Sequence, residues 1–185
     1  MARIPPVTRE QVADKDKPAY DAFMASRQGR PNVGPYTLLL HMPEMAQKLE
    51  ALRLWLRDEA SLSQKIQELV MISVAREMSC GFIWYAHAAA ARKAGLRDDI
   101  VDNIREKRPL TNLDADEQAA VDFTRELLQN RRVSQKTFDA ATARFGPRGV
   151  MTLTNLIACY AVLAYNMNTY ELDAPTHPTE KALTP

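Results

Sequence analysis

Signals that start or stop helices recur along the whole chain, and they constrain its fold more than any other feature. Proline or a capping side chain precedes most of the apolar patterns, and Gly95 and Gly146 follow two of them. No two-residue hairpin signal such as Asn-Gly occurs anywhere in the sequence. The chain is therefore predicted to be all-α.

The expected helices follow from these signals. In the first half of the chain, one helix runs from residue 17 to near Gly29, one is opened by Pro43, and one is started by a capping box at 61–64. The next helix covers about 80–94, and another follows a capping box at 114–117. A shorter helix runs from Ser134 to 146, and a long apolar helix covers about 150–169. Residues 69–75 are β-branched enough for a buried strand. However, the apolar pattern continues from Ile66 to Met78, and that length favours a helix.

Length and charge limit the kind of protein. The 185 residues are enough for one domain with its own core, predicted to span 1–185 with an N-terminal arm (about 1–15) and a C-terminal tail (about 174–185). A net charge of +1 gives no reason to expect nucleic acid or a membrane as partner, and no apolar run reaches the ~20 residues that cross a bilayer. The N-terminus lacks the apolar core of a secretory signal, and two cysteines 79 positions apart make no disulfide framework. A cytoplasmic location is expected.

Three ionisable groups of different kinds fall in one core-forming stretch. Glu68 lies among apolar residues, Cys80 follows 12 positions later, and His87 follows 7 positions after that. Buried ionisable groups are costly unless they are paired or used, so this combination indicates a site.

On a helix, Cys80, Ile83, Trp84 and His87 share one face, because spacings of three, four and seven return to the same side. Cys80 would stand at the helix start, where the dipole and free N–H groups favour a thiolate. Glu68 comes close to His87 only if the chain turns near residues 79–81, which Gly81 makes plausible.

Each residue also has a purely structural interpretation. Cys80 could be a packed small hydrophobe, His87 a satisfied core histidine, and Glu68 the partner of Arg76 or Lys65 in a salt bridge. Trp84 and Tyr85 are residue types that most often pack. Cys159 is interpreted as structural, and His41 and His177 are assigned to a surface loop and to the tail.

Other chemistries fit poorly. The chain has no His-Glu-x-x-His and no Cys-x-x-Cys, so no metal site is predicted, and no cofactor is expected. A phosphate-binding glycine loop, a nucleophile elbow and a basic-aromatic nucleic-acid signature are also missing from the sequence.

The spacing of Glu68, Cys80 and His87, followed by residues 91–96, resembles the signature of the carboxymuconolactone decarboxylase superfamily, which includes the alkylhydroperoxidase D proteins. Residues 29–32, followed by residues 38–43, and residues 160–172 are similar to the longer single-chain members, and the resemblance covers about residues 15–173. The resemblance implies an all-helical alkylhydroperoxidase D-like fold and a homo-oligomer, commonly a trimer or hexamer, with a dimer also possible. Through the decarboxylase branch, it also implies a link to aromatic catabolism.

The hydroperoxidase branch uses Cys-x-x-Cys, and here Ile83 stands in place of the resolving thiol. A sulfenic acid on Cys80 would have no local partner. A thiol peroxidase that uses Cys80 is therefore the second hypothesis, with Cys159 as a substitute only if the fold brings it near. A non-catalytic helical oligomer with a degenerate pocket is the third.

The decarboxylase branch is the leading hypothesis: a cofactor-free lyase step on a small carboxylated or lactone substrate. This chemistry needs an acid–base group, which His87 supplies with Glu68 beside it, and a cation for the carboxylate. Arg76 or Arg92 could provide the cation. Across the hypotheses, the expected catalytic residues are Glu68, His87 and Cys80, although in the decarboxylase scheme Cys80 could serve only to line the pocket. The expected substrate contacts are Trp84, Ile83, Arg76 and Tyr85.

Overall fold

The computed structural model describes residues 2–26, 34–59, 61–174 and 180–184, and these residues contain helices and no strand. The predicted all-α class is confirmed. The elements in order are η1 (Arg9–Gln11), η2 (Asp14–Asp16), α1 (Lys17–Ser26), α2 (Pro35–Leu39), α3 (Pro43–Asp58), α4 (Gln64–Glu77), α5 (Gly81–Lys93), α6 (Asp98–Arg105), α7 (Ala115–Asn130) and α8 (Gln135–Thr169). The expected helix end near Gly29, the family-like residues 29–32 and His177 lie outside the described residues.

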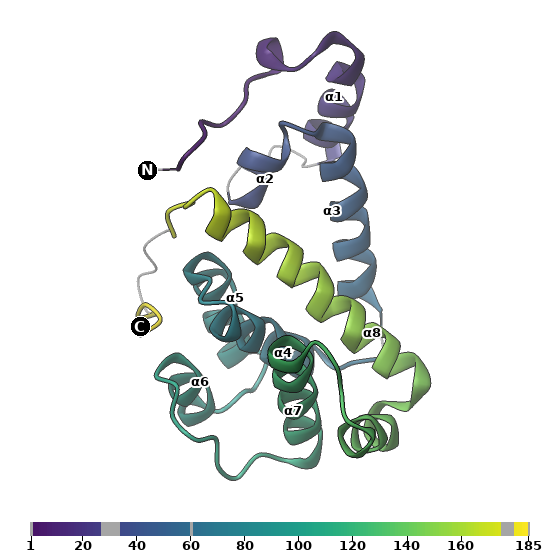
Figure 1. Cartoon of the computed structure of the whole chain (residues 1–185), viewed down its shortest axis with the longest axis vertical. Coiled ribbons are helices and arrows are strands. Elements are labelled where there is room, and N and C mark those ends of the chain that lie inside the picture. The colour runs from purple at the N-terminus through teal and green to yellow at the C-terminus, as the bar shows by residue number, and fades with distance from the viewer. Residues whose placement is uncertain (1, 27–33, 60, 175–179, 185) are drawn as a thin grey trace.

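Helix α4 is the centre of the fold. It packs against α5, α7 and α8, and ten of its residues are buried. Figure 1 shows α8 crossing the molecule diagonally, with α3 along one side and α4, α5 and α7 beneath it. Helix α1 packs on α3 at the end of the molecule farthest from α6 and α7. This arrangement explains the near-continuous apolar run of α4, because every face of this helix meets another element.

The helix starts follow the sequence signals, with one shift. Asp114 accepts hydrogen bonds from the backbone of Asp116 and Glu117, and the Glu117 carboxylate accepts from the Asp114 N–H in return. In contrast, α4 is capped by Ser63, two residues later than the expected capping box. Ser61 instead donates a hydrogen bond to the Thr152 hydroxyl at 2.8 Å and ties this loop to α8.

The two helices expected at the C-terminal end meet in α8. Gly146 interrupts its helical backbone with φ 65° and ψ 174°, and Pro147 follows directly. The chain can take this left-handed φ because glycine has no Cβ. By length and composition α8 could cross a membrane, but 56% of its most apolar window is buried inside the fold, as expected for a core helix.

Residues near both ends of the chain pack against the helices. The Arg3 N–H donates to the Tyr170 carbonyl at 2.8 Å. At the other end, the Trp84 indole N–H donates to the Lys181 carbonyl at 2.8 Å, and Arg92 binds the Glu180 carboxylate at 3.1 Å. The described part of the tail, residues 180–184, is therefore non-helical as expected, but it is held against α5 and α6.

Candidate functional site

The packing of α4 against α5 brings Glu68 and His87 together. The Nδ1 atom of His87 lies 2.9 Å from Oε2 of Glu68, and their side chains are 20% and 12% exposed. The chain reverses between the two helices at Ser79, which has a left-handed φ of 50°, just before Gly81 begins α5. The expected proximity of the two groups is thus present, although the serine and not the glycine adopts the left-handed conformation.

The alternative partners of Glu68 are engaged elsewhere. Lys65 binds Asp114 at 2.7 Å and Glu117 at 2.9 Å, and Arg76 donates to backbone carbonyls. When Nδ1 of His87 carries the hydrogen, the Glu68 carboxylate accepts it in this contact. The remaining ring nitrogen, Nε2, is left for other partners.

A small pocket of about 140 Å³ opens beside His87. Its lining is mostly apolar and comes from α2, α3, α5 and α8: Pro35, Tyr36, Arg53, Phe82, Ile83, Ala86, His87, Tyr160, Leu163 and Met167. The ring of Tyr160 meets the imidazole edge-on, with 5.1 Å between centroids and 81° between planes. Burial raises the pKa of Tyr160 to about 12, so the phenol keeps its proton at neutral pH.

A second polar group contributes to the lining of this pocket. Arg53 donates through Nε and Nη2 to the buried carboxylate of Glu50 at 2.7 and 2.9 Å, and the Tyr36 hydroxyl donates to the same carboxylate. The hydrogen bonds that Arg53 donates to Glu50 raise the pKa of Arg53 above its usual value. Burial, and then the hydrogen bond to Glu50, raise the pKa of Tyr36. A guanidinium has five N–H donors, and Glu50 takes two of them.

Cys80 is held away from this pocket. It is the N-cap residue of α5, is 1% exposed, and is not part of the pocket lining. Burial raises the pKa of its thiol, and the backbone N–H groups of Ile83 and Phe82 lower it by less. The stabilising effect expected from the helix start is present, but desolvation outweighs it. Burial likewise raises the pKa of Cys159 to about 11.

Of the other predicted site residues, only some line the pocket beside His87. Ile83 lines the pocket, whereas Trp84 is fully buried behind it, with its indole bound to the tail. Tyr85, Arg76 and Arg92 do not line the pocket. The structure therefore brings together Glu68, His87 and Ile83.

Sequence reasoning missed Tyr36, Arg53 and Tyr160. The available signals were weak. Arg53 follows Glu50 by three positions, which is the spacing of a helical ion pair, and Tyr160 begins the C-terminal segment already noted as family-like. Neither signal points to a pocket, because it is the contact of α3 with α8 that brings these side chains to His87.

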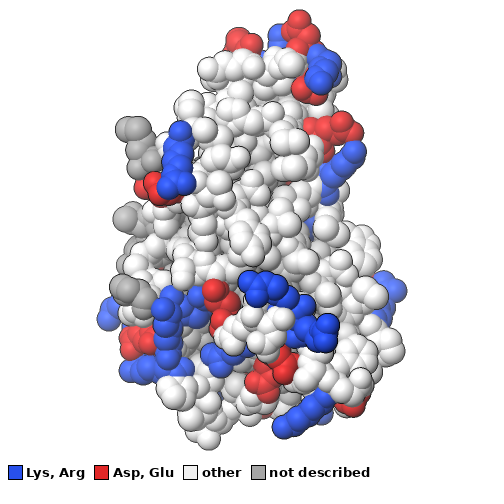
Figure 2. Space-filling view, in the orientation of Figure 1, with Lys and Arg blue, Asp and Glu red and all other residues white. Residues whose placement is uncertain are grey.

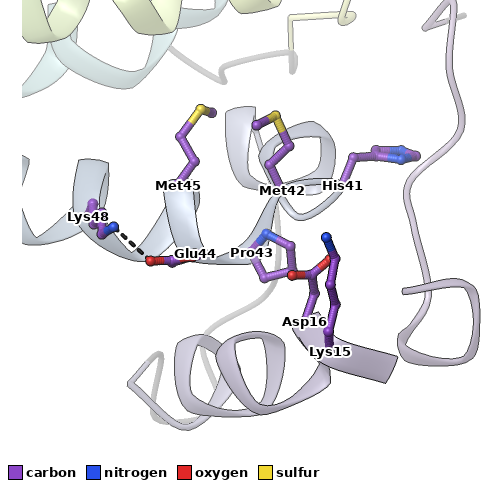
Figure 3. Close-up of a pocket in the computed structure, with 8 residues that line it drawn as sticks. All are labelled: Lys15, Asp16, His41, Met42, Pro43, Glu44, Met45 and Lys48. Atoms are coloured by element: carbon purple, nitrogen blue, oxygen red, sulfur yellow. Dashed lines mark hydrogen bonds and ion pairs between the residues drawn. The ribbon is translucent and has the colours of Figure 1, made fainter. Parts of the chain in front are cut away.

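His41 lies in a different hollow of about 430 Å³, shown in Figure 3 and lined by residues 15–16, 41–45 and 48. Its Nε2 atom is 3.0 Å from the Pro5 carbonyl oxygen, and Glu44 is paired with Lys48 at 2.7 Å. This hollow therefore has no acid–base pair comparable to Glu68 and His87. Among the described residues, no cluster of three or more His, Cys, Asp or Glu could hold a metal ion.

Comparisons with known proteins agree on one group. The model of the Carboxymuconolactone decarboxylase family matches residues 43–126, a range that contains Glu68, Cys80 and His87. No curated protein matches the chain.

Two solved structures are similar. One is a protein of unknown function from Agrobacterium tumefaciens, named as a candidate AhpD antioxidant defence protein. It has 15% sequence identity and a TM-score of 0.69, and the match covers 76% of this chain and 97% of that chain. The other is an uncharacterised peroxidase-related protein from Ralstonia eutropha JMP134 with an alkylhydroperoxidase AhpD core. It has 16% identity, 94% and 92% coverage, and a TM-score of 0.71.

At 15% and 16% identity, the two solved structures support the fold alone. The family match concerns residues 43–126, the segment that carries the motif. Residues 43–126 thus match the Carboxymuconolactone decarboxylase family, as the spacing of Glu68, Cys80 and His87 predicted, and the chain has the AhpD-like fold.

Proposed function

We propose that the protein is an enzyme that carries out cofactor-free acid–base chemistry, a decarboxylation or related lyase step, on a small carboxylated or lactone substrate. The contact between His87 and Glu68 at the edge of a small, mostly apolar pocket carries this proposal. A carboxylate that holds one imidazole nitrogen fixes the ring and stabilises its protonated form, so the other nitrogen can exchange a proton with a bound substrate.

In a decarboxylation, the bond between the substrate carbon and its carboxylate breaks and CO2 leaves. The electron pair moves through the adjacent double bond to a carbon that takes a proton from Nε2 of His87. One proton is consumed for each CO2 released, and solvent returns it to His87. The Glu68 carboxylate, in contact with Nδ1, stabilises the imidazolium that donates the proton.

Arg53 replaces Arg76 and Arg92 as the cation in this proposal. It lines the same pocket as His87, and its position is fixed by Glu50 and Tyr36. The donors that Glu50 does not use can bind a substrate carboxylate, and the Tyr160 hydroxyl can donate to a carbonyl oxygen beside them. The pocket volume of about 140 Å³ favours a compact substrate.

The thiol-peroxidase alternative has less support. Cys80 is buried, its thiol has a raised pKa, and Ile83 occupies the resolving position. The non-catalytic alternative expects a closed pocket around His87, whereas the His87 side chain is 20% exposed.

The proposed enzyme acts as a homo-oligomer in the cytoplasm. Large apolar side chains remain exposed on α3 and α8, which pack against each other: Met42 just before α3, Leu52 and Trp55 on α3, and Met151, Val162 and Tyr165 on α8. Figure 2 shows few charged side chains on the face crossed by α8. Residues 39–45 and 153–165 looked from sequence too apolar for the core of one chain. Much of both segments is nevertheless buried within one chain, so the exposed residues alone carry the proposal.

The test is to offer the purified protein carboxymuconolactone and, separately, tert-butyl hydroperoxide. We expect release of CO2 from the lactone that is lost in His87→Gln and retained in Cys80→Ser. Consumption of the hydroperoxide that disappears in Cys80→Ser would overturn the proposal in favour of the peroxidase.

A further inference from the structure

A separate pocket of about 620 Å³ lies at the end of α4, and its lining shares no residue with the His87 pocket. It is formed by the end of α4, the turn into α5, the loop between α6 and α7, and α7 itself. Its charged lining consists of four cations and one anion: Arg76, Lys107, Arg108, Arg125 and Glu77. The pocket is therefore strongly positive.

Two of these cations already have acidic partners. Arg125 pairs with Glu77 at 3.6 Å, and Arg108 pairs with Glu106 at 2.9 Å. Glu77 also accepts a hydrogen bond from Gln129 at 2.9 Å. Within the described part of the chain, no carboxylate forms an ion pair with Arg76 or Lys107.

Arg76 is the unusual member of this group. It is only 6% exposed, and its Nη1 atom donates to the carbonyl oxygens of Arg105 at 2.9 Å and Thr184 at 2.8 Å. Its Nε–H has no hydrogen-bond partner among the described residues. Burial lowers the pKa of Arg76, and Glu77 acts against this shift. A buried guanidinium without an anion is unfavourable, so this side chain is suited to receive one.

We propose that this pocket binds the oxyanion group of a small dianionic metabolite, either a phosphate or a pair of carboxylates, with Arg76 against the anion and Lys107 and Arg108 at the rim. The guanidinium fork matches both kinds of oxyanion in geometry. A volume of about 620 Å³ leaves room for an organic part of the ligand beside its oxyanion group. Ser79 also lines the pocket, so the ligand lies against the turn that joins α4 and α5.

The test is isothermal titration calorimetry on the full chain with two probes, inorganic phosphate and succinate, in chloride buffer at constant ionic strength. We expect saturable binding of at least one probe. Tighter binding of phosphate identifies a phosphate-bearing ligand, and tighter binding of succinate identifies a dicarboxylate.

The variants locate the binding site. Lys107 has a left-handed φ of 55° at the end of α6, a conformation that asparagine tolerates, so Lys107→Asn removes the charge with little backbone strain. We expect it to weaken binding at least fivefold. The matched control is Lys93→Asn, an exposed lysine at the end of α5 outside the pocket, which should leave binding unchanged.

Two further variants complete the design. Arg76→Lys keeps the charge but loses the fork and should weaken binding further. Because this side chain is buried and could matter for folding, the conclusion depends on Lys107→Asn. His87→Gln should bind the probe as the wild type does, which separates this pocket from the proposed active site. The absence of saturable binding of both probes, or binding unchanged by Lys107→Asn, would overturn the proposal.

Discussion

The two ends of one motif on α5 have very different surroundings. Cys80, at the N-cap, is 1% exposed and its thiol has a raised pKa, whereas His87, two turns later, lines a pocket and contacts Glu68. Both belong to the face that the spacing predicted. Periodicity therefore identifies residues on the same side of a helix, but packing against the neighbouring elements decides which of them a substrate can reach.

Two opposing influences act on the pKa of the Cys80 thiol. At the start of α5, backbone N–H groups lower the pKa of Cys80, as a helix N-terminus should. Loss of water around the thiol has the larger effect. An activated cysteine needs both a favourable electrostatic position and access to solvent, and Cys80 has only the first.

The largest expected effect tests the assignment of chemistry to His87 and not to Cys80. We expect His87→Gln and Glu68→Gln each to lower turnover of the lactone substrate by roughly 10²–10⁴-fold, because the proton donor or the group that holds it is lost. Steady-state kinetics with circular dichroism as a folding check would measure this.

Cys80→Ser is the matched control on the same helix. It should change turnover by less than about threefold, because the thiol does not line the pocket. A loss comparable to that of His87→Gln would reverse the contrast between the two ends of the motif.

A second prediction concerns Arg53, which lines the same pocket as His87. Arg53→Lys keeps the charge but cannot hold Glu50 through two donors and a substrate at once, so we expect KM to rise by about tenfold or more with a smaller change in kcat. Arg57→Lys, an exposed position on the same helix that pairs with Asp58, should leave both constants unchanged. An equal effect of the two substitutions would remove Arg53 from the site.

A third prediction concerns the reactivity of the two cysteine thiols. Cys80 and Cys159 are both buried with raised pKa values, so at pH 8 we expect iodoacetamide to alkylate them at least about tenfold more slowly in the native protein than in urea. After mild peroxide treatment, intact mass should show no disulfide. A Cys80–Cys159 disulfide would instead restore a peroxidase mechanism.

The smallest expected effect is on stability. The pKa of Cys159 rises from 9.0 to about 11 in the folded state, so the folded protein holds this proton over a range in which the unfolded chain has lost it. The resulting stability is complete below pH 9 and declines as the pH rises towards 11, by about 1 kcal/mol at pH 10. Urea unfolding at pH 8.5 and 10 would measure it, and Cys159→Ser should flatten the slope.

Much of the helical structure could be predicted from local chemistry. Pro43, the capping box at Asp114 and the break at Gly146 each act within a few residues, so their effects are visible in the sequence. The cap of α4 was misplaced by two residues because Ser61 and Ser63 are equally good caps locally. The long-range bond from Ser61 to Thr152 separates them in the folded chain.

The sequence by itself determined the all-α class and the pairing of Glu68 with His87, because helical periodicity and a short turn act over fewer than 20 positions. Only the tertiary structure decided which cation lines the same pocket as His87. Arg53 reaches the pocket because α3 packs on α8, while Arg76, closer to the motif in sequence, points to a separate pocket at the end of α4. Proximity along the chain predicts contacts within one helical hairpin, but contacts between distant helices depend on how their side chains pack.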